Sequence, residues 1–113
     1  MAETIKKFST DYSLLEVRPD IVVVPKNVDD IKKIVKFVSV HQNDKEYQVT
    51  SSRDQGDRFG LSLTARSAGT DMTGGPLNHG IILDFMKYFT EIGTVIPSAD
   101  YETGTVTVGP GVF

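Results

Sequence analysis

The sequence contains no cysteine, no tryptophan and no long hydrophobic run in its 113 residues. Without cysteine the chain can form no disulfide, no thiolate metal site and no iron–sulfur cluster, and it has no cysteine nucleophile. The longest aliphatic run, residues 21–24, is far shorter than the roughly 20 residues of a membrane-spanning helix. No apolar segment follows Met1 as it would in a secretory signal. We therefore expect a soluble, cytoplasmic domain.

Strong charge of either sign is also missing, because the formal net charge is only −3. A mildly acidic chain lacks the basic surface that holds nucleic acid, so we expect no nucleic-acid partner. The content of 39% hydrophobic and 24% charged residues is ordinary for a globular domain and argues against disorder. The length by itself predicts a single domain.

Glycine is absent from the first 55 residues, and all ten glycines lie from Gly56 onward. This distribution predicts regular structure in the first half of the chain, and strands with glycine-bearing turns in the second. The last residues, 108–113, form an apolar, strand-like end without a polar tail. Because a terminal strand needs a partner for its backbone groups, we expect the chain to be the front portion of something larger.

The first half predicts the opening of a βαβ unit. Residues 1–20 are compatible with a short helix or an extended arm, whereas the β-branched run at 21–24 is typical of a strand buried on both faces. Asn27 is a suitable N-cap, and we expect His41 near the C-terminal end of the helix, where the dipole favours it. Between them, apolar residues recur at the spacing of an amphipathic helix: Val28, Ile31, Ile34, Val35 and Val38.

The second half predicts strands separated by loops. Residues 42–60 are polar and without periodicity, which indicates a surface loop. Apolar and polar residues alternate from Leu61 to Arg66, as in a strand with one buried face, and Ile81 to Asp84 predict a third, buried strand. Two further strand-like segments flank a hairpin connection at 100–104: residues 92–96 and 105–108.

The segment from Arg66 to Gly75 carries the chemistry. Its small residues let backbone N–H groups approach a ligand, and consecutive N–H groups can form a nest for a diphosphate. On composition alone, a plain glycine-rich turn between two strands is an equally good interpretation. No lysine follows Gly74 and Gly75, and the spacing is not G-x-G-x-x-G, so P-loop enzymes and ordinary Rossmann dehydrogenases are disfavoured.

Three segments in order resemble the FAD-binding domain of the vanillyl-alcohol oxidase and p-cresol methylhydroxylase (PCMH) superfamily. They are the strand, proline and helix cap at 18–31, the loop and strand at 66–84, and the strand and Pro-Gly-Val turn at 104–112. Within the superfamily, they are similar to FAD-linked oxidases of the glycolate oxidase and D-lactate dehydrogenase kind. The resemblance extends over nearly the whole chain.

The resemblance implies an α+β fold with an α/β-type first subdomain. A small parallel sheet with helices would be followed by the start of a second, antiparallel subdomain. The chain would then be a partial PCMH-type FAD-binding domain, truncated within the second subdomain. Its expected parts are an arm at 1–20, a first subdomain at 21–91 that includes the 42–60 loop, and the beginning of the second at 92–113.

The resemblance also implies where FAD binds. The amides of residues 67–71 would hold the pyrophosphate, and Asp84 would fix the turn after its strand. Some relatives attach the flavin through a histidine where this chain has Thr70, so we expect non-covalent FAD; His79 is expected to be a solvated loop residue. The implied cofactor-binding residues are Arg66, Ser67, Ala68, Gly69, Thr70, Asp71, Gly74 and Gly75.

By the same resemblance, the parent protein would move a hydride from a small 2-hydroxy acid, such as glycolate or D-lactate, to FAD. Its partners would be FAD, the remainder of the flavoprotein and that substrate. No catalytic residue and no metal ligand is predicted here, so the segment alone should be inactive. Two alternatives stay open: a stand-alone, non-enzymatic nucleotide-binding or interaction module, and an enolpyruvyl-glucosamine reductase, which shares the fold.

Overall fold

A parallel three-stranded sheet organises the chain. The computed structural model describes residues 2–47, 49–50, 58–100 and 102–112. The sheet has the order β1 (Ile21–Val23), β5 (Ile81–Asp84), β4 (Leu63–Arg66), and both pairings are parallel. Ile82, at the middle of β5, is 0% exposed and forms the centre of a small apolar core. The predicted parallel sheet is confirmed.

The predicted burial of the first strand is wrong. β1 lies at an edge of the sheet, and Ile21 is 50% exposed. The chain places β5 between β1 and β4, so β5 rather than β1 has neighbours on both sides. A β-branched run does not reveal whether a strand will be central or at an edge, because that position depends on the order of later strands.

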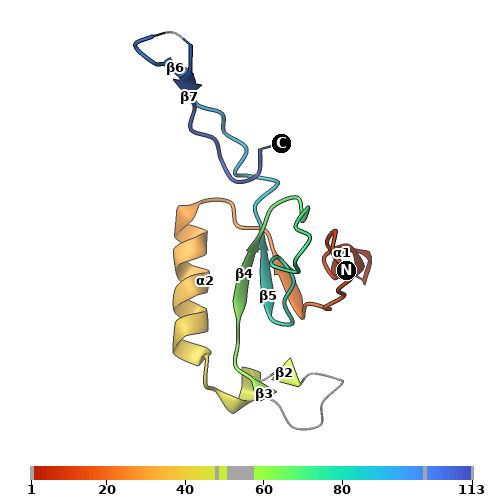
Figure 1. Cartoon of the computed structure of the whole chain (residues 1–113). Coiled ribbons are helices and arrows are strands. Elements are labelled where there is room, and N and C mark those ends of the chain that lie inside the picture. Colours follow the sequence, from red (N-terminus) through yellow and green to blue (C-terminus); the bar gives the residue numbers. More distant parts are fainter. Residues whose placement is uncertain (1, 48, 51–57, 101, 113) are drawn as a thin grey trace.

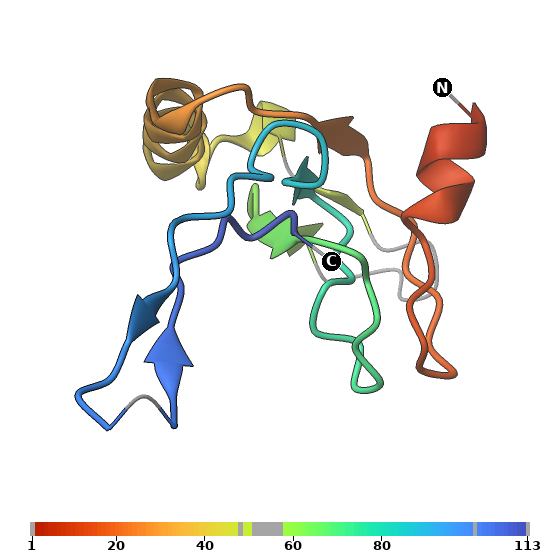
Figure 2. The ribbon, with the colours of Figure 1, turned by 90° about the horizontal axis from the view of Figure 1, so that it is seen from above.

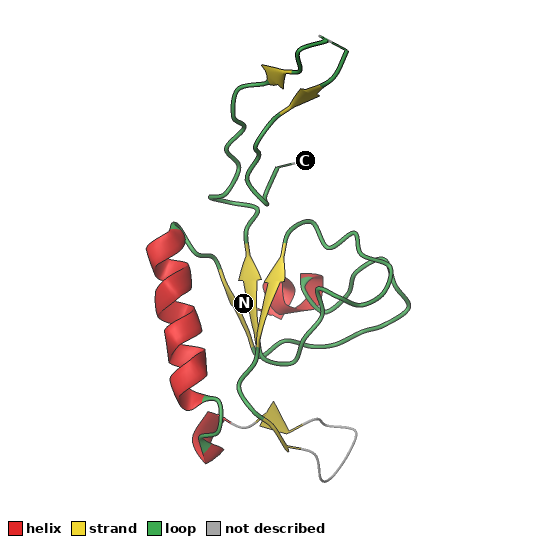
Figure 3. Cartoon of the chain, turned by 60° about the vertical axis from the view of Figure 1, so that its left-hand side comes forward, coloured by secondary structure: helices red, strands yellow, loops and turns green. Residues whose placement is uncertain are grey.

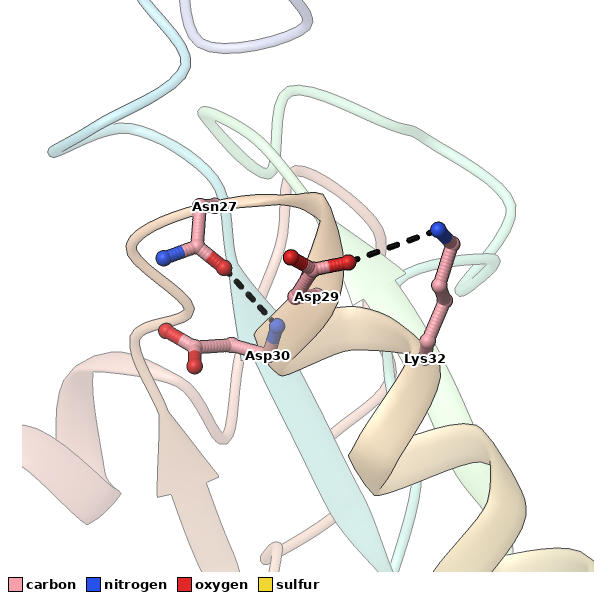
Figure 4. Close-up of polar contacts among 4 residues, drawn as sticks. All are labelled: Asn27, Asp29, Asp30 and Lys32. Atoms are coloured by element: carbon pink, nitrogen blue, oxygen red, sulfur yellow. Dashed lines mark hydrogen bonds and ion pairs between the residues drawn. The ribbon is translucent and has the colours of Figure 1, made fainter.

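Helix α2 (Val28–His41) begins as its sequence predicts. The side-chain oxygen of Asn27 accepts a hydrogen bond from the Asp30 amide at 2.9 Å, as drawn in Figure 4. The Asp30 carboxylate in turn accepts from the Lys26 amide at 3.0 Å, so two free amides at the helix start are satisfied. At the other end, the ring of His41 lies 2.6 Å from the Asp44 carboxylate, so its partner is a side chain beyond the helix and not the helix carbonyls.

Two helices flank the sheet. α1 (Ala2–Lys7) and α2 lie on opposite sides of it (Figures 1 and 2). Neither helix contains a buried residue. No helix in the described part of the chain has the length and apolar character needed to cross a bilayer.

The segment at 42–60 has more regular structure than its sequence predicts. A short 3-10 helix, η1 (Lys45–Tyr47), precedes an antiparallel pair formed by β2 (Val49–Thr50) and β3 (Arg58–Phe59). Val49 pairs with Phe59. Both residue types favour strands, but the polar residues around them hide this preference in the sequence. Residues 51–57 of the predicted loop lie outside the described residues.

An antiparallel ribbon leaves the carboxyl end of β5 and projects away from the sheet (Figures 1 and 3). Its tip is the pair β6 (Ile96–Pro97) and β7 (Gly104–Thr105), and Ile92 bridges to Val108 lower down. Because of this ribbon, the radius of gyration is 17.2 Å, whereas a compact domain of this size has about 13 Å. The sequence prediction of a parallel unit followed by an antiparallel one is confirmed.

Candidate functional site

The loop from Arg66 to Gly75, which we call the cradle, begins where β4 ends. All three parallel strands present their carboxyl ends at this edge of the sheet, where open α/β sheets bind ligands (Figure 1). A groove of about 570 Å³ opens along the cradle and is also bordered by Pro76 and by Val112 near the end of the ribbon. Segments about 40 residues apart in the sequence therefore meet around one hollow.

The backbone amides in the cradle form two groups. Those of residues 67–71 donate no hydrogen bond to any described residue. The amides of Thr73 and Gly75 donate to the Asp71 carboxylate at 2.6 and 3.4 Å, and that of Gly74 donates to Asp11 at 3.0 Å. A run of consecutive unpaired N–H groups is an anion-binding arrangement, because each N–H carries a partial positive charge.

Two cradle positions require glycine. Gly69 and Gly74 have φ angles of 73° and 84°, in the left-handed region that side chains disfavour. A Cβ atom on Gly69 would also lie only 2.7 Å from Nε of Arg66. Glycine at position 69 therefore allows the chain to turn tightly while lying directly against a guanidinium group.

Arg66 is buried, with 6% of its surface exposed, although it belongs to the polar set of the alternating pattern in its strand. The residues after α1 cover that face. Nη2 donates to the Thr10 carbonyl at 2.8 Å, Nη1 donates to the Phe8 carbonyl at 3.4 Å, and the guanidinium lies 5.0 Å from the centre of the Phe8 ring. The local pattern does not indicate this burial, because the cover comes from more than 50 residues earlier in the chain.

The electrostatics of the cradle combine one buried cation with two hydrogen-bonded carboxylates. Burial lowers the pKa of Arg66, and the negative charges of Asp11 and Asp84 offset part of that effect. Hydrogen bonds from the Thr73 hydroxyl and amide lower the pKa of Asp71. Desolvation alone would raise the pKa of Asp11, but hydrogen bonds from Ser13 and Gly74 outweigh it and lower the pKa. Both carboxyls are therefore ionised at neutral pH.

The structure shows three residues at the cradle that the sequence did not predict, and it shows the contact of Asp84, which the sequence did predict. Phe8, Thr10 and Asp11 support the cradle, and the only local signal was the Asp-x-Ser pattern at 11–13, which is typical of a turn. Asp84 accepts the Met86 amide at 2.9 Å, so its predicted role in the turn is confirmed. Within the described ranges, no cluster of His, Asp or Glu side chains could hold a metal ion.

Comparison with known proteins decides the family. A sequence model of the family described as "FAD binding domain" matches residues 19–113. The chain belongs to this FAD-binding domain family. FAD is its cofactor, as the resemblance implied, and the unpaired amides of residues 67–71 fit the diphosphate that FAD contains.

Two curated proteins are similar in sequence to this chain. D-2-hydroxyglutarate dehydrogenase of Escherichia coli is 30% identical over 105 residues, which cover 93% of this chain and 8% of that protein. The protein of the same name from Haemophilus influenzae is 31% identical over 84 residues, which cover 74% of this chain and 7% of that protein. The chain thus spans less than a tenth of either relative. No solved structure matches it significantly.

Proposed function

We propose that the cradle holds the diphosphate of FAD in a flavin-dependent oxidoreductase that acts on a 2-hydroxy acid. The observation that carries this proposal is the run of unpaired amides at residues 67–71 beside an open groove. Gly74 and Gly75 shape the far side of the cradle, where their amides already have carboxylate partners. The amides of Gly74 and Gly75 therefore stabilise the conformation of the loop, and the amides of residues 67–71 bind the ligand.

The buried charge of Arg66 supports an anionic ligand. Its guanidinium lies directly against Gly69, within the run of residues 67–71, and no described carboxylate forms an ion pair with it. Asp11 and Asp84 offset only part of the cost of burying this charge, and a bound diphosphate reduces the cost further. The contribution of Arg66 is therefore electrostatic, through the loop, since its N–H groups donate to the Phe8 and Thr10 carbonyls.

The flavin is held without a covalent bond to the cradle in this proposal. Thr70 is exposed beside the groove, and its hydroxyl offers a hydrogen bond but no imidazole nitrogen for attachment. FAD supplies the redox chemistry when bound, as the acceptor of the hydride. The residues described here bind the diphosphate and orient the cofactor at the carboxyl edge of the sheet. We place an arm at 1–20, a first subdomain at 21–91 and the start of a second at 92–113.

The substrate class rests on the two relatives, whose name specifies D-2-hydroxyglutarate. All 2-hydroxy acids share the hydroxyl-bearing carbon beside a carboxylate, which is the group that a flavin oxidises in such substrates. The proposal therefore includes the dicarboxylate 2-hydroxyglutarate and the smaller acids glycolate and D-lactate. These differ in the second carboxylate, which a dicarboxylate-binding site must pair with a cationic group.

The test uses the full-length protein that carries this chain. We expect it to contain, or take up, one FAD per chain, and to show reduction of the flavin absorbance when 2-hydroxyglutarate, D-lactate or glycolate is added without oxygen. A protein that stays colourless with excess FAD would contradict the proposal. A protein that binds FAD but is reduced by none of these acids would instead support a non-enzymatic binding module.

A further inference from the structure

The residues that follow α1 lie along the cradle and contact it at several points. The Phe8 and Thr10 carbonyls accept hydrogen bonds from the Arg66 guanidinium, at the start of the cradle. The Tyr12 amide donates to the Asp71 carbonyl at 3.0 Å, near the middle. We call residues 8–15 the clasp, and Figure 2 shows this segment beside the loop that follows β4.

The clasp reaches the far side of the cradle through Asp11. One oxygen of the Asp11 carboxylate accepts the Ser13 amide at 2.8 Å, and the other accepts the Gly74 amide at 3.0 Å. Leu15 lies over the same glycine, since a Cβ atom on Gly74 would be 2.6 Å from its side chain. Asp11 is therefore fixed by its own turn while it holds a residue 63 positions later in the chain.

This arrangement determines which amides remain available to a ligand. Asp11 takes the Gly74 amide, and Asp71 takes those of Thr73 and Gly75. The hydrogen bonds hold both carboxylates in fixed positions at the cradle, so the loop has a defined shape before a ligand binds. A loop that is held in its binding shape in advance also loses less conformational entropy when the ligand arrives.

We infer that the clasp sets the shape of the diphosphate cradle, with Asp11 as a positioning residue for the cofactor. The inference rests on the proposed function. It assigns to Asp11 no contact with FAD, because its two oxygens already accept from Ser13 and Gly74. Its effect on affinity passes through the conformation of residues 71–75.

The experiment compares three variants of the full-length protein with the wild type. Asp11→Ala removes all three accepted hydrogen bonds, from the Ser13 amide and hydroxyl and from the Gly74 amide. We expect about tenfold weaker binding of FAD and of ADP, which shares the diphosphate. Asp11→Asn keeps one acceptor oxygen, so we expect a loss of about threefold. The matched control is Asp100→Ala, because Asp100 closes a similar turn with Ser98 and Glu102 at the tip of the ribbon. Its FAD and ADP affinities should equal those of the wild type.

Thermal unfolding of the FAD-free proteins separates positioning from general stability. The inference requires that Asp11→Ala lose affinity at a temperature where it is as fully folded as Asp100→Ala. Wild-type affinity in Asp11→Ala would overturn it, and so would an affinity loss that matches the unfolded fraction. If the wild type itself binds neither FAD nor ADP, the proposed function fails and the inference falls with it.

Discussion

The cradle and the ribbon are both rich in glycine, but their backbone amides have different partners. In the ribbon, glycine amides donate to carbonyls on the opposite strand at 2.7 to 2.9 Å: Gly93 to Thr107, Gly109 to Glu91 and Gly111 to Phe89. In the cradle, the amides of residues 67–71 have no such partners among the described residues. Glycine thus allows the two arms of the ribbon to pair with each other, whereas in the cradle it occurs in a loop whose amides at residues 67–71 have no partner among the described residues.

Steric detail explains the difference. A Cβ atom on Gly93 would lie 2.9 Å from the Thr107 carbonyl oxygen, so glycine there allows two strands to approach closely. Gly69 instead adopts a φ angle of 73°, which turns the backbone before a neighbouring strand can pair with it. Glycine content alone therefore does not indicate an anion site, whereas a run of unpaired amides beside a groove does.

The largest expected effect comes from a charge placed in the cradle. Gly69→Asp adds a negative charge to the proposed diphosphate site and forces a side chain onto the Arg66 guanidinium at a left-handed position. We expect FAD affinity to fall roughly 100-fold or more, since like charges in contact cost several kcal/mol. Equilibrium titration with FAD measures this, and Gly69→Ala separates the steric part from the charge. Wild-type affinity in Gly69→Asp would place the diphosphate elsewhere.

The charge of Arg66 gives the next effect. Arg66→Met keeps a long side chain over Phe8 but removes the cation that lies against Gly69. We expect about tenfold weaker FAD binding, because the electrostatic attraction between the buried charge and the diphosphate is lost. The free energy of unfolding should change by less than about 1.5 kcal/mol, since the cost of burying a charge is removed as well. Equal FAD affinity in Arg66→Met, measured by titration, would show that the buried charge does not act on the ligand.

Local patterns predicted much of this site because much of it is local. Asn27 caps α2 through the Asp30 amide only three residues away, and Asp84 closes its turn through Met86. The small residues from 67 to 75 likewise indicated where backbone N–H groups could face a ligand. In each case, the residues that make the structure are neighbours in the sequence.

The remaining features depend on contacts between distant residues. Arg66 alternates with apolar residues in a manner typical of a solvent-facing side chain, but carbonyls more than 50 positions earlier cover it. The sequence predicts the turn that contains Asp11, but it does not predict the hydrogen bond between Asp11 and Gly74. β1 was expected to be buried on both faces, but it lies at an edge of the sheet, where only β5, from a later part of the chain, pairs with it.

A substitution in the ribbon should lower the stability of the protein but leave its FAD affinity nearly unchanged. Gly93→Ala introduces a Cβ atom close to the Thr107 carbonyl, and we expect the free energy of unfolding to fall by about 1–3 kcal/mol. FAD affinity of the folded protein should change by less than about twofold, because the Gly93 amide already donates to the Thr107 carbonyl. Denaturant unfolding and FAD titration measure the two quantities. A large affinity loss with unchanged stability would reverse the comparison.

The smallest effect concerns pH. Hydrogen bonds from Thr73 and from Ser98, respectively, lower the pKa values of Asp71 and Asp100 below their ordinary 3.8. A lowered folded-state pKa adds stability that is fully present above 3.8 and is lost as the pH falls through the folded-state value. We expect Asp71→Asn and Asp100→Asn to be less stable than the wild type at neutral pH, with the difference closing in acid.

FAD binding distinguishes these two aspartates. At neutral pH only Asp71→Asn should weaken FAD binding, by about threefold, because only Asp71 organises the cradle. Unfolding curves recorded across the acidic range, together with FAD titrations at neutral pH, test both statements. A stability difference that persists unchanged far below 3.8 would contradict the direction of the pKa shifts.

Amide hydrogen exchange of the full-length protein, with and without FAD, tests the central claim most directly. We predict that the amides of residues 67–71 exchange rapidly without FAD and become protected when it binds. The amides of Thr73 to Gly75 and those of Gly93, Gly109 and Gly111 should already be protected without FAD, because they have partners in the chain. Protection by FAD at 73–75 or in the ribbon, with residues 67–71 unchanged, would contradict the account.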